Sequence, residues 1–221
     1  MIAIDGPSGA GKSSAGRVLA ERLGYVFIDT GAMYRALALK ALRASLPLDS
    51  APELAAMARD TRIELGVGGR GVLLDGVDVS DAIRSRELSA ASSRVSVHPA
   101  VRREMVARQR ELGREGGVVL DGRDIGTAVF PDAELKFYVD ADPSRRAVRR
   151  HKELLAAGQP SDAAAIEREI RERDHADSTR SDSPLTRAPD AVPLDTTELS
   201  MDEVVERMLQ VASERLLKKD F

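Results

Sequence analysis

Residues 6–13 read Gly-Pro-Ser-Gly-Ala-Gly-Lys-Ser, a complete G-x-x-x-x-G-K-[ST] phosphate-binding loop. The apolar run Met1–Ile4 precedes the loop, and apolar residues with helical spacing, from Ala15 to Leu23, follow it. This context matters because the motif functions where a strand delivers the loop and a helix leaves it. The glycines let the backbone curve around a phosphate with its N–H groups pointing inward. A glycine-rich turn without a ligand is the alternative, and the match at every fixed position argues against it.

Each position of the loop has an expected chemical role. Lys12 is expected to reach the terminal phosphates of a nucleotide and to act in catalysis, and Ser13 to ligate Mg²⁺. The N-terminus of the following helix adds positive potential. The residues predicted to bind the nucleotide are Gly6, Pro7, Ser8, Gly9, Ala10, Gly11, Lys12, Ser13 and Ser14.

Composition narrows the class of protein. A chain of 221 residues can form one α/β domain with an insertion or two small domains. No segment approaches the roughly 20 apolar residues of a membrane span, and Met1 leads straight into the first apolar run. Cys is absent and the three His are scattered, which argues against a zinc site. The net charge of −3 argues against a general nucleic-acid binder. We therefore expect a cytoplasmic protein that binds neither nucleic acid nor membrane.

Short apolar runs, most of them ending in an acidic residue, predict five parallel strands. Continuous Val, Ile and Leu suit strands that are buried on both faces. Helical patterns separate the runs, which predicts βαβ units in a doubly wound α/β sheet. In such sheets ligands bind beyond the carboxyl ends of the strands, where the acidic residues fall. The expected strands are Ile2–Asp5, Tyr25–Asp29, Val118–Asp121, Leu135–Asp140 and Ala191–Asp195.

The chain between the second and third strands is too long for a simple crossover. A crossover needs little more than about a dozen residues, whereas roughly 70 lie between the helix after Asp29 and Val118. The pattern predicts an antiparallel meander with turns at Gly68-Gly69 and Asp75-Gly76, followed by helices around 81–92 and 99–114. The meander strands are Arg62–Val67, Gly71–Leu74 and Val77–Val79.

The C-terminal half contains two further helix signals and a stretch dense in charge. Asp142-Pro143 starts a helix that is expected to reach Ala157 before Gly158, and Ser200 to Glu203 form a capping box. Residues 145–180 are rich in Arg. A solvated helix face explains most of these Arg residues.

Three classes of P-loop protein compete. A GTPase switch needs an N-K-x-D motif, and this chain contains no Asn. A motor or transporter ATPase usually belongs to a larger machine, and the chain has no extension of that size. A small kinase needs a P-loop, a separate acceptor site and arginines that neutralise the transferred charge, and the chain offers all three. Another small kinase, acting on a sugar or a different nucleotide, and a nucleotide-sensing regulator are the alternatives.

Several motifs closely resemble those of the bacterial cytidylate (CMP) kinases. They occur in the family's order, and the similarity runs from Ile2 to about Glu206. They are Asp29-Thr30-Gly31-Ala32-Met33-Tyr34-Arg35, Asp121-Gly122-Arg123-Asp124-Ile125-Gly126-Thr127, Phe130-Pro131-Asp132-Ala133, and Arg173-Asp174 followed by Asp177, Arg180 and Pro184-Leu185. The resemblance implies transfer of the γ-phosphoryl of Mg·ATP to CMP or dCMP.

The resemblance also implies a domain plan. A P-loop NTPase core with a five-stranded parallel sheet would comprise 1–44 and 118–221, with a short lid at about 145–175. Residues 45–117 would form the inserted nucleotide-monophosphate-binding domain. Some Arg of the 145–150 cluster would close over ATP, and the resemblance does not decide which. We expect a monomer.

The resemblance implies roles for individual residues of the acceptor site. The acceptor's phosphate would be held by Tyr34, Arg35, Arg123 and Arg180, since planar guanidinium groups suit phosphate. The cytosine would be read by Ser93, Arg102 and Asp124. The sugar would be held by Arg173 and Asp177, with Thr30 nearby. Asp121 would hold Mg²⁺ together with Ser13, and Arg123 and Arg180 would act with Lys12 in catalysis.

Purely structural roles compete with some of these assignments. Arg123 and Asp124 could form an ion pair at a strand end, and Tyr34 could be a core aromatic residue. Arg173 and Asp177 could form an ordinary pair four residues apart on a helix. Ser93, within Ser92-Ser93, carries the weakest signal of the set.

Overall fold

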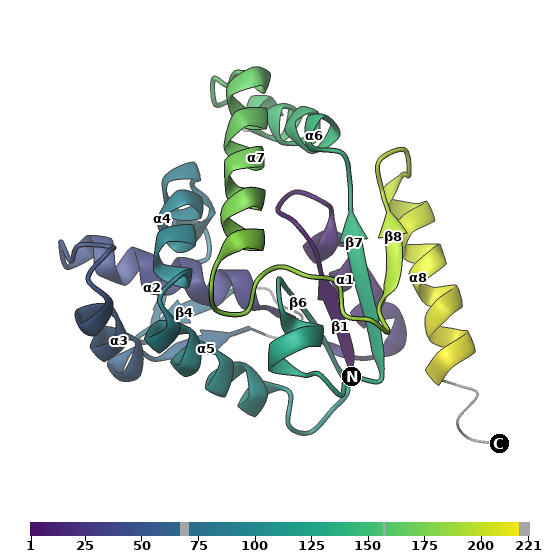
Figure 1. Ribbon diagram of the computed structural model, residues 1–221, viewed down its shortest axis with the longest axis horizontal. Coiled ribbons are helices and arrows are strands. Elements are labelled where there is room, and N and C mark those ends of the chain that lie inside the picture. The colour runs from purple at the N-terminus through teal and green to yellow at the C-terminus, as the bar shows by residue number, and fades with distance from the viewer. Residues whose placement is uncertain (67–70, 157, 217–221) are drawn as a thin grey trace. The chain divides into compact units, whose positions relative to one another are not determined.

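The computed structural model describes residues 1–66, 71–156 and 158–216 (Figure 1). The chain divides into two compact units. The first unit comprises Met1–Leu19 with Asp121–Phe221, and the second comprises Ala20–Leu120.

The principal sheet has five strands in the order β2-β6-β1-β7-β8. Within the first unit β1 pairs with β7 in parallel, Ile2 facing Leu135, and β7 pairs with β8 in parallel, Phe137 facing Val192. All four residues of β1 are buried, as expected for a strand covered on both faces. The prediction of an α/β fold with a five-stranded parallel sheet is confirmed. The strands are β1 (Ile2–Asp5), β2 (Val26–Asp29), β6 (Val118–Gly122), β7 (Leu135–Asp140) and β8 (Val192–Asp195).

Helices of the first unit follow its strands. The capping box predicted at the start of α8 is present, because Ser200 N–H donates to Glu203 and Glu203 N–H donates to Ser200 Oγ at 3.3 Å. Helices α6 and α7 pack together through Ala147, Leu154, Ile166 and Ile170, and Figure 1 shows them side by side. The helices are α1 (Lys12–Leu23), which continues into the second unit, the π-helical turn η3 (Ile125–Val129), α6 (Pro143–Ala156), α7 (Ala163–Thr179) and α8 (Met201–Leu216).

The second unit surrounds an apolar core rich in Ala and Leu. Leu37, Leu54, Val95 and Met105 lie at its centre with no exposed surface. The predicted meander is present, because β3, β4 and β5 form an antiparallel sheet. The elements are α2 (Thr30–Arg43), α3 (Ala51–Asp60), β3 (Ile63–Leu65), β4 (Val72–Leu74), β5 (Val77–Asp78), the 3₁₀ turn η2 (Ala82–Arg84), α4 (Arg86–Ser96) and α5 (Pro99–Leu112).

Some helices of the second unit differ from the predicted ones. The helix expected over 81–92 is a 3₁₀ turn followed by α4, because Ser85 caps a new helix by accepting from Leu88 N–H. The helix expected around 99–114 is present as α5, which ends at Leu112. Helix α3 was not predicted. The expected turn at Gly68-Gly69 and the expected helix end at Ala157 lie outside the described residues.

Candidate active site

The phosphate-binding loop connects β1 to α1, as its motif requires. Gly6 has φ +144°, and a Cβ there would lie 1.9 Å from the carbonyl oxygen of Val139 on β7. Gly11 has φ +90°, and its carbonyl accepts the first helical hydrogen bond of α1, from Ala15 N–H at 3.0 Å. Both glycines are therefore needed for the backbone path itself.

Lys12 lies inside the loop. Its side chain is 5% exposed, and Nζ donates to the carbonyl of Pro7 at 2.7 Å. Burial, with the nearby positive charge of Arg123, lowers the pKa of Lys12 to about 7. A ligand with negative charge would favour the protonated ammonium, so the site suits an anion.

The two predicted magnesium ligands contact each other. Ser13 Oγ donates a hydrogen bond to Asp121 Oδ2, although 108 positions separate the two residues in the sequence. Asp121 lies near the end of β6 and is buried, whereas Ser13 lies in the first turn of α1 and is exposed. A hydroxyl and a carboxylate are oxygen donors of the kind that Mg²⁺ prefers, so this pair fits the ion. Among the described residues there is no group of three or more His, Cys, Asp or Glu arranged to hold a metal by themselves.

The acidic and basic residues after β6 and on α7 form a second cluster in the first unit. Arg123 Nε donates to Asp177 Oδ2 at 2.8 Å, and Arg180 Nη2 lies 3.5 Å from Asp124 Oδ1. Arg123 thus contacts an aspartate of α7, and Asp124 lies beside the arginine that follows α7. Burial raises the pKa of Asp177, but Arg123 and Arg173 outweigh it and hold that pKa below its ordinary value. The ionised form of Asp177 is thus favoured beside these arginines.

The remaining predicted residues lie in the second unit. Thr30 starts α2 and is buried, and Arg35 Nη2 pairs with Asp29 Oδ2 at 2.9 Å. Tyr34 packs against the apolar core of this unit, a contact that its alternative role as a core aromatic residue also predicts.

Two further predicted residues of this unit lie on α4 and α5. Arg102 is 3% exposed, and its Nη1 donates to Ser96 O at 3.4 Å. Ser93 Oγ donates to Ser89 O at 3.4 Å, as serines within helices commonly do. These contacts do not by themselves assign a ligand to either residue.

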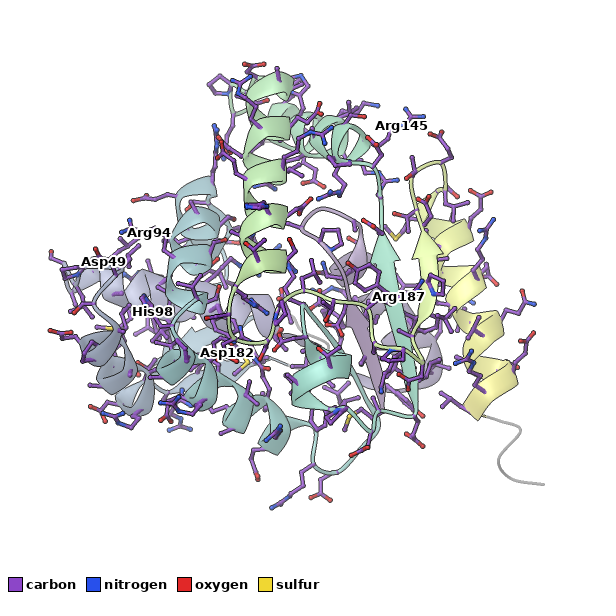
Figure 2. The ribbon with its side chains drawn as sticks, in the orientation of Figure 1. Asp49, Arg94, His98, Arg145, Asp182 and Arg187 are labelled. Atoms are coloured by element: carbon purple, nitrogen blue, oxygen red, sulfur yellow. The ribbon has the colours of Figure 1, made fainter. Side chains whose placement is uncertain are left out.

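The four arginines of the 145–150 cluster are in different environments. Arg145 pairs with Glu198 on the surface, and Figure 2 shows it at the start of α6 near the loop between β8 and α8. Arg149 donates to the carbonyl of Thr196, and Arg150 pairs with Glu153. Arg146 is the buried member of the four, with 2% exposed surface.

Sequence reasoning did not single out three buried charged residues of the first unit, Asp5, Lys136 and Arg146. Arg146 donates to Ser8 O at 3.0 Å and forms a two-bond pair with Asp174, which ties the phosphate-binding loop to α7. Nothing in the sequence distinguishes Arg146 from its exposed neighbours. Asp5 ends β1 and accepts two backbone hydrogen bonds from η3. Its signal was present, because an acidic residue at the end of a buried strand lies at the ligand-binding edge of such a sheet.

Comparison with known proteins identifies the family. The family model described as cytidylate kinase matches residues 2–214. The cytidylate kinase of Geobacillus kaustophilus (strain HTA426) is 52% identical over 217 residues, covering 97% of each chain. That of Syntrophotalea carbinolica (strain DSM 2380 / NBRC 103641 / GraBd1) is also 52% identical, covering 97% of this chain and 92% of the relative.

A solved structure supports the fold independently. The shikimate kinase of Bacteroides thetaiotaomicron superposes with a TM-score of 0.50 at 13% identity, covering 96% of this chain and 97% of that one. At that identity the likeness concerns the fold alone. The resemblance noted from the sequence motifs is confirmed by the family match, and the chain belongs to the cytidylate kinase family.

Proposed function

We propose that the protein transfers the γ-phosphoryl group of Mg·ATP to the phosphate of CMP or dCMP, giving CDP or dCDP and ADP. Family membership over residues 2–214 supports a nucleoside monophosphate kinase. The observation that carries the proposal is the assembly, within one unit, of Lys12, the Ser13–Asp121 pair and the Arg123–Asp177 pair. Such a set provides for a donor phosphate, a metal and an acceptor anion together.

The donor side is formed by the phosphate-binding loop. Gly6 to Ser14 would enclose the phosphates of ATP, with the Lys12 ammonium directed at the β- and γ-phosphates. Ser13 and Asp121 would hold Mg²⁺, directly or through water. When bound, the ion supplies positive charge to the phosphate oxygens.

The acceptor side follows the family resemblance. Arg123 and Arg180, with Tyr34 and Arg35, would hold the phosphate of CMP. Ser93, Arg102 and Asp124 would read the cytosine, and Arg173 and Asp177 the sugar, with Thr30 nearby. The contacts of Arg123 with Asp177 and of Arg180 with Asp124 support the part that lies in the first unit, because they keep charged groups oriented before a ligand arrives.

Catalysis would consist of alignment and charge neutralisation. The attacking phosphate oxygen is already an anion, so no residue has to remove a proton from it. Lys12, Arg123 and Arg180 would stabilise the charge that spreads over the transferred group in the in-line transition state. The segment 145–175 would act as the lid, and its closure would keep water from the γ-phosphate.

The proposed function can be tested by a simple kinetic measurement. Release of ADP from ATP should depend on added CMP or dCMP. A kinase for a sugar or a different nucleotide would ignore CMP, and a nucleotide-sensing regulator would release no ADP in step with it. ADP release that is equally fast with and without CMP would overturn the proposal.

The insertion 45–117 is proposed as the acceptor-binding domain. Hydrogen exchange with and without CMP should then show protection at Ser93–Arg102 as well as at Thr30–Arg35. Protection confined to the phosphate-binding loop would show that this insertion does not bind the acceptor. We also propose a monomeric, cytoplasmic enzyme. As a separate observation, the described residues include no helix with the length and apolar character of a membrane span.

A further inference from the structure

Asp5 connects two segments of the proposed site. It is the last residue of β1, directly before the phosphate-binding loop, and only 4% of its surface is exposed. Its Oδ1 accepts from the N–H of Ile125 at 2.8 Å, and its Oδ2 accepts from the N–H of Gly126 at 2.7 Å. Ile125 and Gly126 open η3 and follow Arg123 and Asp124 without a break.

We infer that Asp5 is a positioning residue that fixes the Arg123–Asp124 segment for the acceptor nucleotide. The inference rests on the proposed function, because it takes Arg123 and Asp124 as acceptor-binding residues. Asp5 acts through the backbone of η3 and touches no substrate itself. A π-helical turn is a rare backbone form that is frequently found at functional sites, and here two hydrogen bonds from outside the turn hold its first residues.

The chemistry of this position requires a carboxylate. Two N–H donors face Asp5, and a carboxylate offers an acceptor oxygen to each, whereas an amide offers one oxygen and one NH₂ donor. Burial, opposed by these two hydrogen bonds, raises the pKa of Asp5 to about 6. Packing around the contact is tight, since a Cβ at Gly126 would lie 3.3 Å from Asp5 Oδ2 and 3.0 Å from Cδ of Lys136.

The substitution Asp5→Asn tests the inference, with Asp140→Asn as the matched control. Asp140 likewise ends a strand of this sheet, but it is exposed and accepts one N–H, from Ala141 at 2.8 Å. For Asp5→Asn we expect the KM for CMP to rise about tenfold or more, while the KM for ATP stays within about twofold. The exchange of the Ile125 and Gly126 amides should accelerate. Asp140→Asn should change none of these quantities.

A second variant approaches the same contact from the other side. Gly126→Ala places a methyl group against the Asp5 carboxylate, and it should raise the KM for CMP without raising that for ATP. If Asp5→Asn does not fold, the Gly126→Ala variant tests the inference in its place. An equal rise in both KM values, or unchanged amide exchange at Ile125 and Gly126, would overturn the inference.

The proposed function has its own readout. Failure of the unmodified protein to release ADP in response to CMP would contradict the proposed function. The exchange measurement needs no turnover, so it decides separately whether Asp5 holds the Arg123–Asp124 segment in place.

Discussion

The two units of the molecule place their charges differently. Among the described residues, seven charged residues of the first unit are buried, whereas in the second unit one is, Arg102. The seven are Asp5, Lys12, Asp121, Asp124, Lys136, Arg146 and Asp177. The second unit instead has an apolar core built from α2 to α5 and β4.

This difference separates residues that stabilise the fold from residues that serve the reaction. Burying a charge costs free energy unless partners compensate for it. Most of the buried charges in the first unit lie at or next to the phosphate-binding loop, β6 and α7, where we propose that the nucleotide phosphates bind. We therefore expect substitutions of the proposed site residues Lys12 and Asp124 to affect activity more than stability, and core substitutions in the second unit to do the reverse.

The largest expected effect concerns Lys12. Lys12→Ala should lower kcat by about 10²-fold or more, on the order of 3 kcal/mol, because the ammonium acts where negative charge shifts in the transition state. The melting temperature without ligand should change little, since burial already disfavours the charged form. Lys40→Ala, which removes the surface pair with Asp75, is the control. Near-normal turnover in Lys12→Ala would show that the phosphate-binding loop does not take part in catalysis.

The next prediction concerns the choice of base. Asp124 can accept a hydrogen bond from the N4 amino group of cytosine, whereas uracil presents an acceptor there. The kcat/KM for CMP should exceed that for UMP by at least about 10²-fold, roughly 3 kcal/mol. Asp124→Ala should narrow the gap chiefly by harming CMP, and exposed Asp132→Ala should leave it unchanged. Comparable rates with both nucleotides in the unmodified protein would leave only a broader pyrimidine specificity.

The apolar core of the second unit should show the opposite behaviour. Leu54→Ala should lower the free energy of unfolding by about 3 kcal/mol, because Leu54 is fully buried on α3. Below the melting temperature its kcat should stay within about twofold of normal, since the substitution removes packing and no catalytic charge. Leu112→Ala, on an exposed side chain of α5, should be nearly neutral in denaturant unfolding. A large loss of kcat in folded Leu54→Ala would contradict the expectation that core residues of the second unit affect stability rather than activity.

Neighbouring arginines of α6 provide a contrast within one helix. Arg146→Ala should cost about 2 to 3 kcal/mol of stability, because it leaves Asp174 and the Ser8 carbonyl without their buried partner. Arg145→Ala should leave the free energy of unfolding nearly unchanged, because its pair with Glu198 is solvent-exposed. Urea unfolding measures both. Equal costs would show that burial does not govern these pairs.

The smallest expected effect is the pH dependence given by Asp177. Its pKa is lowered in the folded protein, so the stability it contributes is present above the ordinary carboxyl pKa and is lost as the pH falls through the folded value. Asp177→Asn should cost about 1 to 2 kcal/mol at pH 7. The difference from the unmodified protein should shrink in unfolding measurements below about pH 4. A difference independent of pH would show that the charge of Asp177 is not what stabilises the fold.

Sequence patterns sufficed where the signal is local. The phosphate-binding loop, the capping box at Ser200 and the strands with acidic ends all consist of neighbouring residues. Helix α3 was missed because its buried face is Leu54, Ala55 and Ala58, and Ala gives little contrast between core and surface in a chain this rich in Ala.

Contacts between residues far apart in the sequence become visible only in the folded structure. The motifs suggested Ser13 and Asp121 as a pair, and the structure brings them together; whether they bind Mg²⁺ stays a prediction. The two partners of Asp5 are more than a hundred residues away, and so is Ser8, one of the partners of Arg146, so no periodicity could have indicated these contacts. Long-range contacts of single side chains leave no pattern in the sequence.

Because Gly6 lies against β7, a genetic screen for folding and a genetic screen for activity should give different results at this loop. The Val139 carbonyl occupies the space that any side chain at position 6 would need, and that carbonyl belongs to the sheet. In a random library screened only for soluble expression, position 6 should therefore tolerate almost no other amino acid, while position 12 should accept many. Screened for growth that depends on the enzyme, both positions should become invariant. The first glycine of the loop is therefore needed for the protein to fold, whether or not a nucleotide binds.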